Sequence, residues 1–155
     1  MVEAHWQGSH RVIGDTLITE EGGIAMRFIN NTGAPTVKGT VVECSPSVAG
    51  AIEVCPADAP DPVGIMYQSG VANGDPCWVV ISGCADVLIM DTTAAALDYW
   101  VKVSDTVAGR ADATNLAPPG GAINAIEDHF TEIGHVIVPA TAGVDQLARI
   151  VLHFN

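Results

Sequence analysis

The fold is decided by the stretch Lys38-Gly39-Thr40-Val41-Val42-Glu43-Cys44-Ser45 and the small-residue turn Val48-Ala49-Gly50 that follows it. The second half of the chain repeats this order about 60 residues later, with Asp98-Tyr99-Trp100-Val101-Lys102-Val103-Ser104 and Val107-Ala108-Gly109. An apolar-glycine pair, a Gly/Asp turn and a final apolar strand follow in both halves, about 70 residues apart. Such self-similarity indicates a duplicated supersecondary unit. We predict repeat halves at residues 37–82 and 97–154, with an insertion at about 115–130 in the second.

Short β-branched segments, separated by turn residues, fill the chain after residue 33. Their regular spacing predicts an all-β domain with a barrel or sandwich architecture. We expect strands at 24–30, 37–44, 51–55, 63–68, 77–82, 85–90, 99–103, 133–138 and 148–154. Helix signals are confined to one turn at 92–97, with Asp91 as its N-cap, and a short helix at 122–130 in the insertion.

The first 33 residues differ from the rest of the chain. They show poor hydrophobic alternation before Ile24. We predict an extended N-terminal arm that leads into the first strand, followed by a β domain over residues 34–155. Termini are poorly ordered unless something ties them down, so an arm with an aromatic anchor is a candidate for ordering on a partner.

The charge balance restricts the possible partners. The chain has 6 Lys and Arg against 18 Asp and Glu, and neither Lys nor Arg occurs between Gly39 and Val101. A nucleic-acid backbone or an anionic membrane surface needs clustered basic residues, so neither is an expected partner. No run of 18 apolar residues predicts a membrane span. With 48% hydrophobic and only 15% charged residues, we expect surface buried between subunits of a homo-oligomer.

No motif predicts catalysis, a cofactor or a metal site, and we expect the protein not to be an enzyme. The best metal pair, His5 and His10, is more simply explained as polar residues of an exposed arm, and His129 and His135 as solvated or satisfied histidines. We expect His153 to point outward from the last strand. No signal-peptide pattern opens the chain. We therefore expect free thiols at Cys44, Cys55, Cys77 and Cys84, with a Cys44–Cys55 disulfide as the alternative.

Several short glycine-centred motifs carry a family resemblance. They are Val37-Lys38-Gly39-Thr40-Val41-Val42, Pro62-Val63-Gly64-Ile65, Gly83-Cys84-Ala85-Asp86-Val87, Tyr99-Trp100-Val101-Lys102-Val103-Ser104 and the closing strand. Over about residues 33–155, the chain resembles the small capsid decoration (cement) proteins of tailed bacteriophages. It departs from that family's pattern at Leu97-Asp98-Tyr99, where Gly-Asp usually precedes the strand, and in the length of the insertion.

The resemblance implies a compact β-barrel or β-tulip domain without enzymatic activity. It implies assembly in the host cytoplasm and a homotrimer on the outer capsid surface of the virion, bound to the major capsid protein. Arms contact the shell in several such proteins, which makes His5, Trp6, His10 and Arg11 capsid-binding candidates by position. Trp78, Tyr99 and Trp100 are candidates for the core or the oligomer interface, since aromatic residues in apolar strands usually pack. The alternatives are a head-fibre or tail-associated adhesion module and a small-molecule-binding β-barrel.

Overall fold

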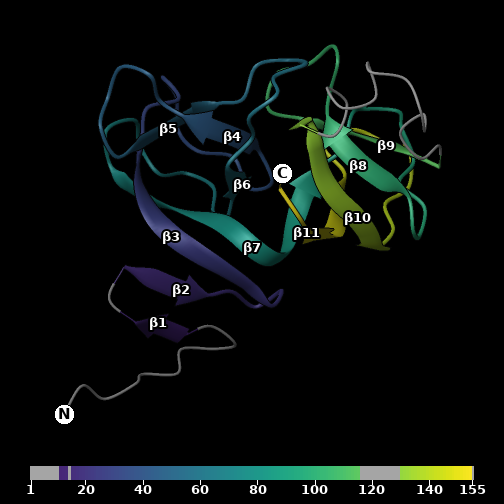
Figure 1. Ribbon diagram of the computed structural model, residues 1–155, viewed down its shortest axis with the longest axis horizontal. Coiled ribbons are helices and arrows are strands. Elements are labelled where there is room, and N and C mark those ends of the chain that lie inside the picture. The colour runs from purple at the N-terminus through teal and green to yellow at the C-terminus, as the bar shows by residue number, and fades with distance from the viewer. Residues whose placement is uncertain (1–10, 14, 116–129, 155) are drawn as a thin grey trace.

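The computed structural model describes residues 11–13, 15–115 and 130–154, which form an all-β fold with almost no helix. Eleven strands belong to one continuous sheet (Figure 1). They are β1 (Arg11–Ile13), β2 (Thr16–Ile18), β3 (Gly23–Asn30), β4 (Val41–Cys44), β5 (Ala51–Val54), β6 (Gly64–Met66), β7 (Pro76–Leu88), β8 (Trp100–Val103), β9 (Ala111–Thr114), β10 (Glu132–Val138) and β11 (Leu147–Leu152). This confirms the predicted fold class.

The first half of the sheet closes into a ring. β3 pairs in parallel with β5, which pairs antiparallel with β4. β4 then pairs with β6, β6 with β7, and β7 with β3, all antiparallel. Five strands thus leave no free edge between them, which is how a small β structure protects its backbone hydrogen-bonding groups.

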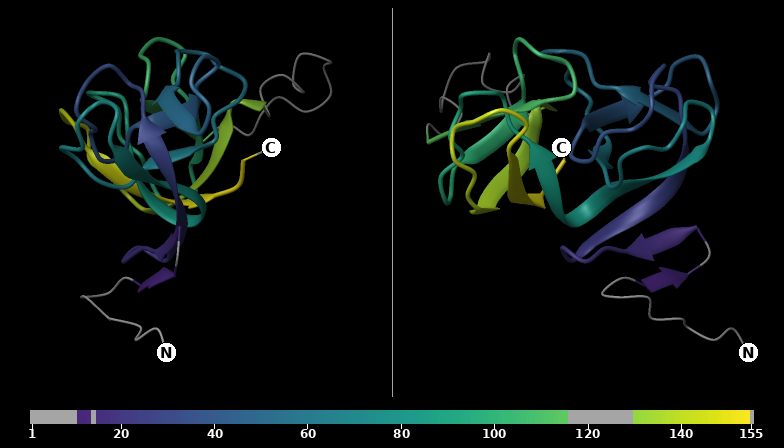
Figure 2. Two further views of the ribbon diagram at one scale, coloured as in Figure 1. Left: turned by 90° about the vertical axis from the view of Figure 1, so that its left-hand side faces the viewer. Right: turned by 180° about the vertical axis from the view of Figure 1, so that it is seen from behind.

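The second half repeats these pairings in the same order and sense. β8 pairs antiparallel with β9 and β10, β10 with β11, and β11 with β7. A parallel bridge between Ile89 and Ala111 closes this ring, as the pair Ile29 and Ala51 does in the first. The two rings lie side by side and share β7 (Figure 2). The structural repeat therefore takes in one strand before each predicted half.

The turns between paired strands are also duplicated. Ser45 Oγ accepts hydrogen bonds from the backbone N–H of Ser47 and Val48. Ser104 Oγ does the same for Thr106 and Val107. Serine in such a turn satisfies backbone donors that the strands cannot reach. The equivalent roles of the Ser45 and Ser104 hydroxyls show that the sequence repeat also repeats the local hydrogen bonding.

β7 is the strand that joins the rings. The sequence predicts separate strands at 77–82 and 85–90, but the structure has one strand of 13 residues. Gly83 adopts a φ of +78°, and an added Cβ would lie 2.5 Å from the Gly22 carbonyl oxygen. Glycine at this position thus lets the strand bend and lets the start of β3 approach closely. Gly83 therefore lies where β7 crosses from the first ring to the second, and not in a turn.

Two further predictions at the level of single elements were wrong. Residues 92–97 form no helical turn, and Asp91 accepts hydrogen bonds from Arg110 and the Asp145 backbone instead of capping a helix. β9 was missed because its sequence, Ala-Asp-Ala-Thr, carries little hydrophobic signal, although Ala111 is fully buried. The predicted helix at 122–130 lies, except for Phe130, outside the described residues.

The predicted arm is partly built into the sheet. β1 and β2 form a hairpin, and β2 pairs with β3; Figure 1 shows the hairpin projecting below the rings. Leu17 is buried in the larger core cluster, which extends from the first ring to Ile150 in the second. Residues 15–22 thus belong to the folded body, in contrast to the predicted extended arm. Within the described residues, no helix is both long and apolar enough to cross a membrane.

Candidate functional site

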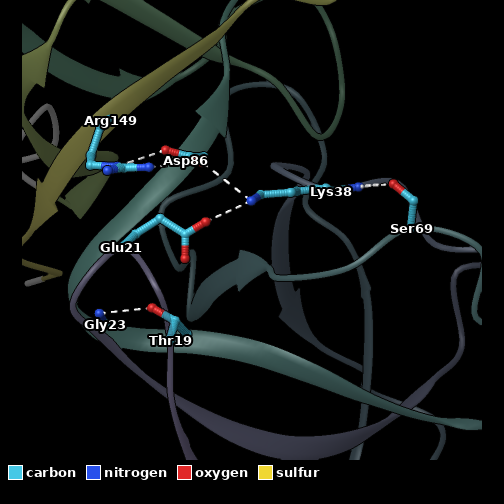
Figure 3. A network of polar contacts seen from close by, with 7 residues as sticks. All are labelled: Thr19, Glu21, Gly23, Lys38, Ser69, Asp86 and Arg149. Atoms are coloured by element: carbon cyan, nitrogen blue, oxygen red, sulfur yellow. Dashed lines mark hydrogen bonds and ion pairs between the residues drawn. The ribbon is translucent and has the colours of Figure 1, made fainter. Parts of the chain in front are cut away.

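A network of four charged side chains joins the turn between β2 and β3 to both rings (Figure 3). Lys38 Nζ lies 2.6 Å from Glu21 Oε1 and 3.2 Å from Asp86 Oδ2. Asp86 on β7 also binds Arg149 on β11, with 2.9 Å between Oδ1 and Nε. Burial alone would raise the pKa of Asp86, but hydrogen bonds and positive charge from Arg149 and Lys38 lower it below its ordinary value. The network therefore stabilises the ionised carboxylate at the seam between the rings.

A groove of about 520 Å³ adjoins this network, between the two rings. Its basic lining groups are Lys38 and Arg110. Lys38 is held by the network, while Arg110 hydrogen-bonds to the Ile89 carbonyl, Asp91 and Asp145. Both cations are thus neutralised within the protein, so the groove is poorly suited to a phosphate or another anionic ligand.

The same pairing holds for every basic side chain that the structure describes. Arg27 binds Asp15, Lys102 binds Asp105, and Lys38, Arg110 and Arg149 are engaged as described above. Nucleic-acid binding requires basic groups that can exchange counterions for phosphates. The described surface offers only basic groups that already have carboxylate partners.

Acidic side chains, by contrast, face one another on the first ring. Glu43 and Glu53 lie directly opposite each other on β4 and β5. Glu53 Oε1 accepts hydrogen bonds from Asn31 and Ser45, at 2.8 and 2.6 Å. Burial and then the charges of Asp61 and Glu53 raise the pKa of Glu43. Like charges directly across a strand pair are destabilising, and a basic partner surface would relieve them.

We expect Glu43→Gln to raise the melting temperature at pH 7 by a small amount, corresponding to less than about 1 kcal/mol because the site is solvated. A carboxylate whose folded-state pKa is raised costs stability once the pH exceeds that pKa. The gain should therefore vanish at a pH below the ordinary glutamate value, where the Glu43 carboxyl is neutral in both the folded and the unfolded state. Thermal melts at pH 7 and pH 3.5 test this.

Glu53→Gln provides the matched control. It removes the same repulsion but also the charge-assisted hydrogen bonds from Asn31 and Ser45, so it should give no gain. An equal gain from both variants, or a Glu43→Gln gain that persists in acid, would contradict the assignment of repulsion to this strand pair.

All four cysteines are free thiols, as expected. Burial, with smaller contributions from Glu43 and Asp61, raises the pKa of Cys55 to about 12. Burial raises the pKa of Cys77 to about 11. The thiolate is the nucleophile, so these two side chains are poor candidates for covalent chemistry.

The predicted aromatic residues have intramolecular roles in the structure. Trp78 and Tyr99 are half-buried and pack against the larger core cluster. The Trp100 ring lies 4.2 Å from that of His135. Their role in an oligomer interface stays a prediction. Of the capsid-binding candidates, His5, Trp6 and His10 lie outside the described residues, and Arg11 is described only as part of the β1 backbone.

The structure also gathers three side chains that no pattern in the sequence connects. Glu132 and His135 on β10 meet His153, just after β11. Glu132 Oε1 lies 3.3 Å from His153 Nε2 and 4.0 Å from His135 Nε2. His153 was predicted to point outward; it is exposed but contacts both residues. The spacing of Glu132 and His135 alone gave no signal, because the third member comes from the neighbouring strand.

An apolar face lies on the N-terminal part of the sheet. Ile18 pairs with Ile24, and Met26 pairs with Thr16 on the same face. The three apolar side chains are 38%, 41% and 41% exposed, whereas Leu17 and Ala25, which point the other way, are buried. This part of the sheet is thus apolar on both faces, and only one face is covered within the described chain.

Comparison with protein-family models and with curated proteins found no match to this chain.

Proposed function

We propose that this protein is a non-enzymatic, trimeric capsid decoration protein that binds the outer surface of a tailed-phage shell and stabilises it. The observation that carries the proposal is the uncovered apolar face of Ile18, Ile24 and Met26, which spans β2 of the projecting hairpin and the adjoining strand β3. An exposed apolar patch on a small, otherwise closed β domain is typical of a protein-binding surface.

The charge distribution supports the same function. The described cations are paired internally, while the carboxylates of Glu43, Glu53 and Asp61 gather on one ring. Such a surface is suited to a basic protein and repels nucleic acid. A trimer would engage several capsid chains at once, so weak individual contacts would add up to firm attachment.

The test is co-sedimentation of purified protein with expanded empty capsids of the phage that encodes it. We expect saturable binding by the full chain and at least about tenfold weaker binding after deletion of residues 2–10, because an ordering arm contributes contact area. The deletion stops at residue 10 because Leu17, Thr19 and Glu21 belong to the folded body. Undiminished occupancy would show that the arm is not the anchor.

A pair of surface variants separates the apolar face from general surface hydrophobicity. Ile24→Ser/Met26→Ser should weaken capsid binding, whereas Leu97→Ser/Val144→Ser, at positions that are 61% and 68% exposed, should not. Equal effects of the two double variants would count against this face. Failure of the full chain to bind capsids, together with binding to host cells, would instead favour the head-fibre or tail-associated adhesion module.

A further inference from the structure

The cluster of Glu132, His135 and His153 has the composition of a metal site. Its three ligand atoms, one from each side chain, all lie within 4.8 Å of one another. Two imidazole nitrogens and one carboxylate oxygen form a ligand set that zinc accepts, with bonds of about 2.0–2.2 Å. Tetrahedral geometry at that bond length places ligand atoms about 3.3 Å apart. The distance of 3.3 Å between His153 Nε2 and Glu132 Oε1 matches this ligand separation. The distance of 4.0 Å between His135 Nε2 and Glu132 Oε1 must shorten slightly for both atoms to bind one ion.

The surrounding structure holds the three side chains in place. The Glu132 side chain is only 5% exposed. The ring of His135 packs against the Trp100 ring at an interplanar angle of 54°, and the His153 ring lies 5.0 Å from that of His135. The backbone N–H of His153 donates to the Ile133 carbonyl at 2.9 Å, which fixes the chain end against β10. Ligands held on a strand, or tied to one by a backbone hydrogen bond, lose little conformational freedom on binding an ion.

Packing, rather than hydrogen bonding, orients the His135 ring. Its Nδ1 atom is buried and has no hydrogen-bond partner in the described part of the chain. The position of Nε2, on the side of Glu132, is then set by contact with Trp100 and by the strand. A metal ion at Nε2 would fix the imidazole without displacing an existing hydrogen bond of its ring.

We propose that Glu132, His135 and His153 bind one divalent transition-metal ion of the zinc class, with the fourth position open to water or to a side chain of a neighbouring molecule. This departs from the expectation that the chain has no metal site, and it does not depend on the capsid role. The ion would tie the end of β11 to the start of β10. It would therefore stabilise the second ring at its C-terminal edge.

The test uses the full chain, titrated with Zn²⁺ by calorimetry after treatment with chelator. We expect one ion per chain and, at free zinc about a hundredfold above Kd, a melting temperature about 5–10 °C higher than in chelator. Co²⁺ in place of Zn²⁺ should give the visible absorption of a bound, low-coordinate ion. Absence of stoichiometric binding would overturn the proposal and leave only a contact between the histidines and Glu132.

Two variants locate the site. His153→Ala changes a side chain that is 41% exposed, so the fold should survive, and zinc binding should weaken at least about 100-fold. His5→Ala/His10→Ala removes the histidines of the arm and should bind zinc as the full chain does. Undiminished binding by His153→Ala, or loss of binding in the arm variant, would place the ion elsewhere and refute the assignment.

Discussion

Gly134→Ala is expected to leave the protein largely unfolded. Gly134 lies on β10 with a φ of +153°, and a Cβ at this position would overlap the carbonyl oxygen of Val151 on β11. It would also lie 2.9 Å from the Val151 carbonyl carbon and 3.0 Å from Ile150 Cγ2. Backbone atoms of a paired strand can move away only by breaking the pairing of β10 with β11.

The expected cost is about 4 kcal/mol or more, which approaches the whole stability of a typical domain. Urea unfolding followed by circular dichroism measures it, with the soluble fraction on expression as a second readout. Gly64→Ala should also be severe. Gly64 occupies the equivalent place on β6, where a Cβ would lie 2.7 Å from the Val80 carbonyl oxygen.

Gly70→Ala is the control for backbone conformation alone. Gly70 has a φ of +86°, but nothing lies within 4 Å of an added Cβ. It should cost about 1–2 kcal/mol, the penalty of the left-handed conformation for alanine. If Gly134→Ala lowers the free energy of unfolding by no more than Gly70→Ala does, then close approach of the strands does not explain the glycine at position 134.

The repeat could be predicted because the residues that recur in it favour one kind of local structure. The motifs around Val41 and Val101, and the glycines at 64 and 134, recur in order, and both valines are fully buried. The sharing of β7 by two rings could not be predicted. Gly83 looked like a turn residue, since a positive φ inside a strand and one in a turn require the same amino acid.

The candidate sites were less predictable than the fold. The ion-pair network draws Glu21, Lys38, Asp86 and Arg149 from four separate segments, and only the closed topology brings them together. The same holds for His153, which joins Glu132 and His135 through strand pairing. Periodicity within one segment indicates which face a residue occupies, but contacts between distant segments depend on register, which the sequence pattern left open.

Asp86→Asn is expected to destabilise the protein by about 2 kcal/mol at pH 7. The Asp86 side chain is 16% exposed and accepts from both Lys38 and Arg149. The substitution keeps the volume but leaves the Arg149 guanidinium without its carboxylate and Lys38 with Glu21 alone. Removing one member of a partly buried charge network lowers the stability by more than the intact network adds to it, because the remaining charges stay partly desolvated without a partner.

Acid pH gives this prediction a second signature. The pKa of Asp86 is lowered in the folded state, so its stabilisation is complete above the ordinary aspartate value and is lost as the pH falls through the lower, folded-state value. The free energies of unfolding of parent and Asp86→Asn should therefore converge from about pH 4 downward. Asp15→Asn, which removes a carboxylate that is 70% exposed from its pair with Arg27, should change stability by less than about 0.5 kcal/mol. A difference between parent and Asp86→Asn that does not change with pH, or an equally large effect of Asp15→Asn, would mean that the seam between the rings is held by apolar packing and not by this carboxylate.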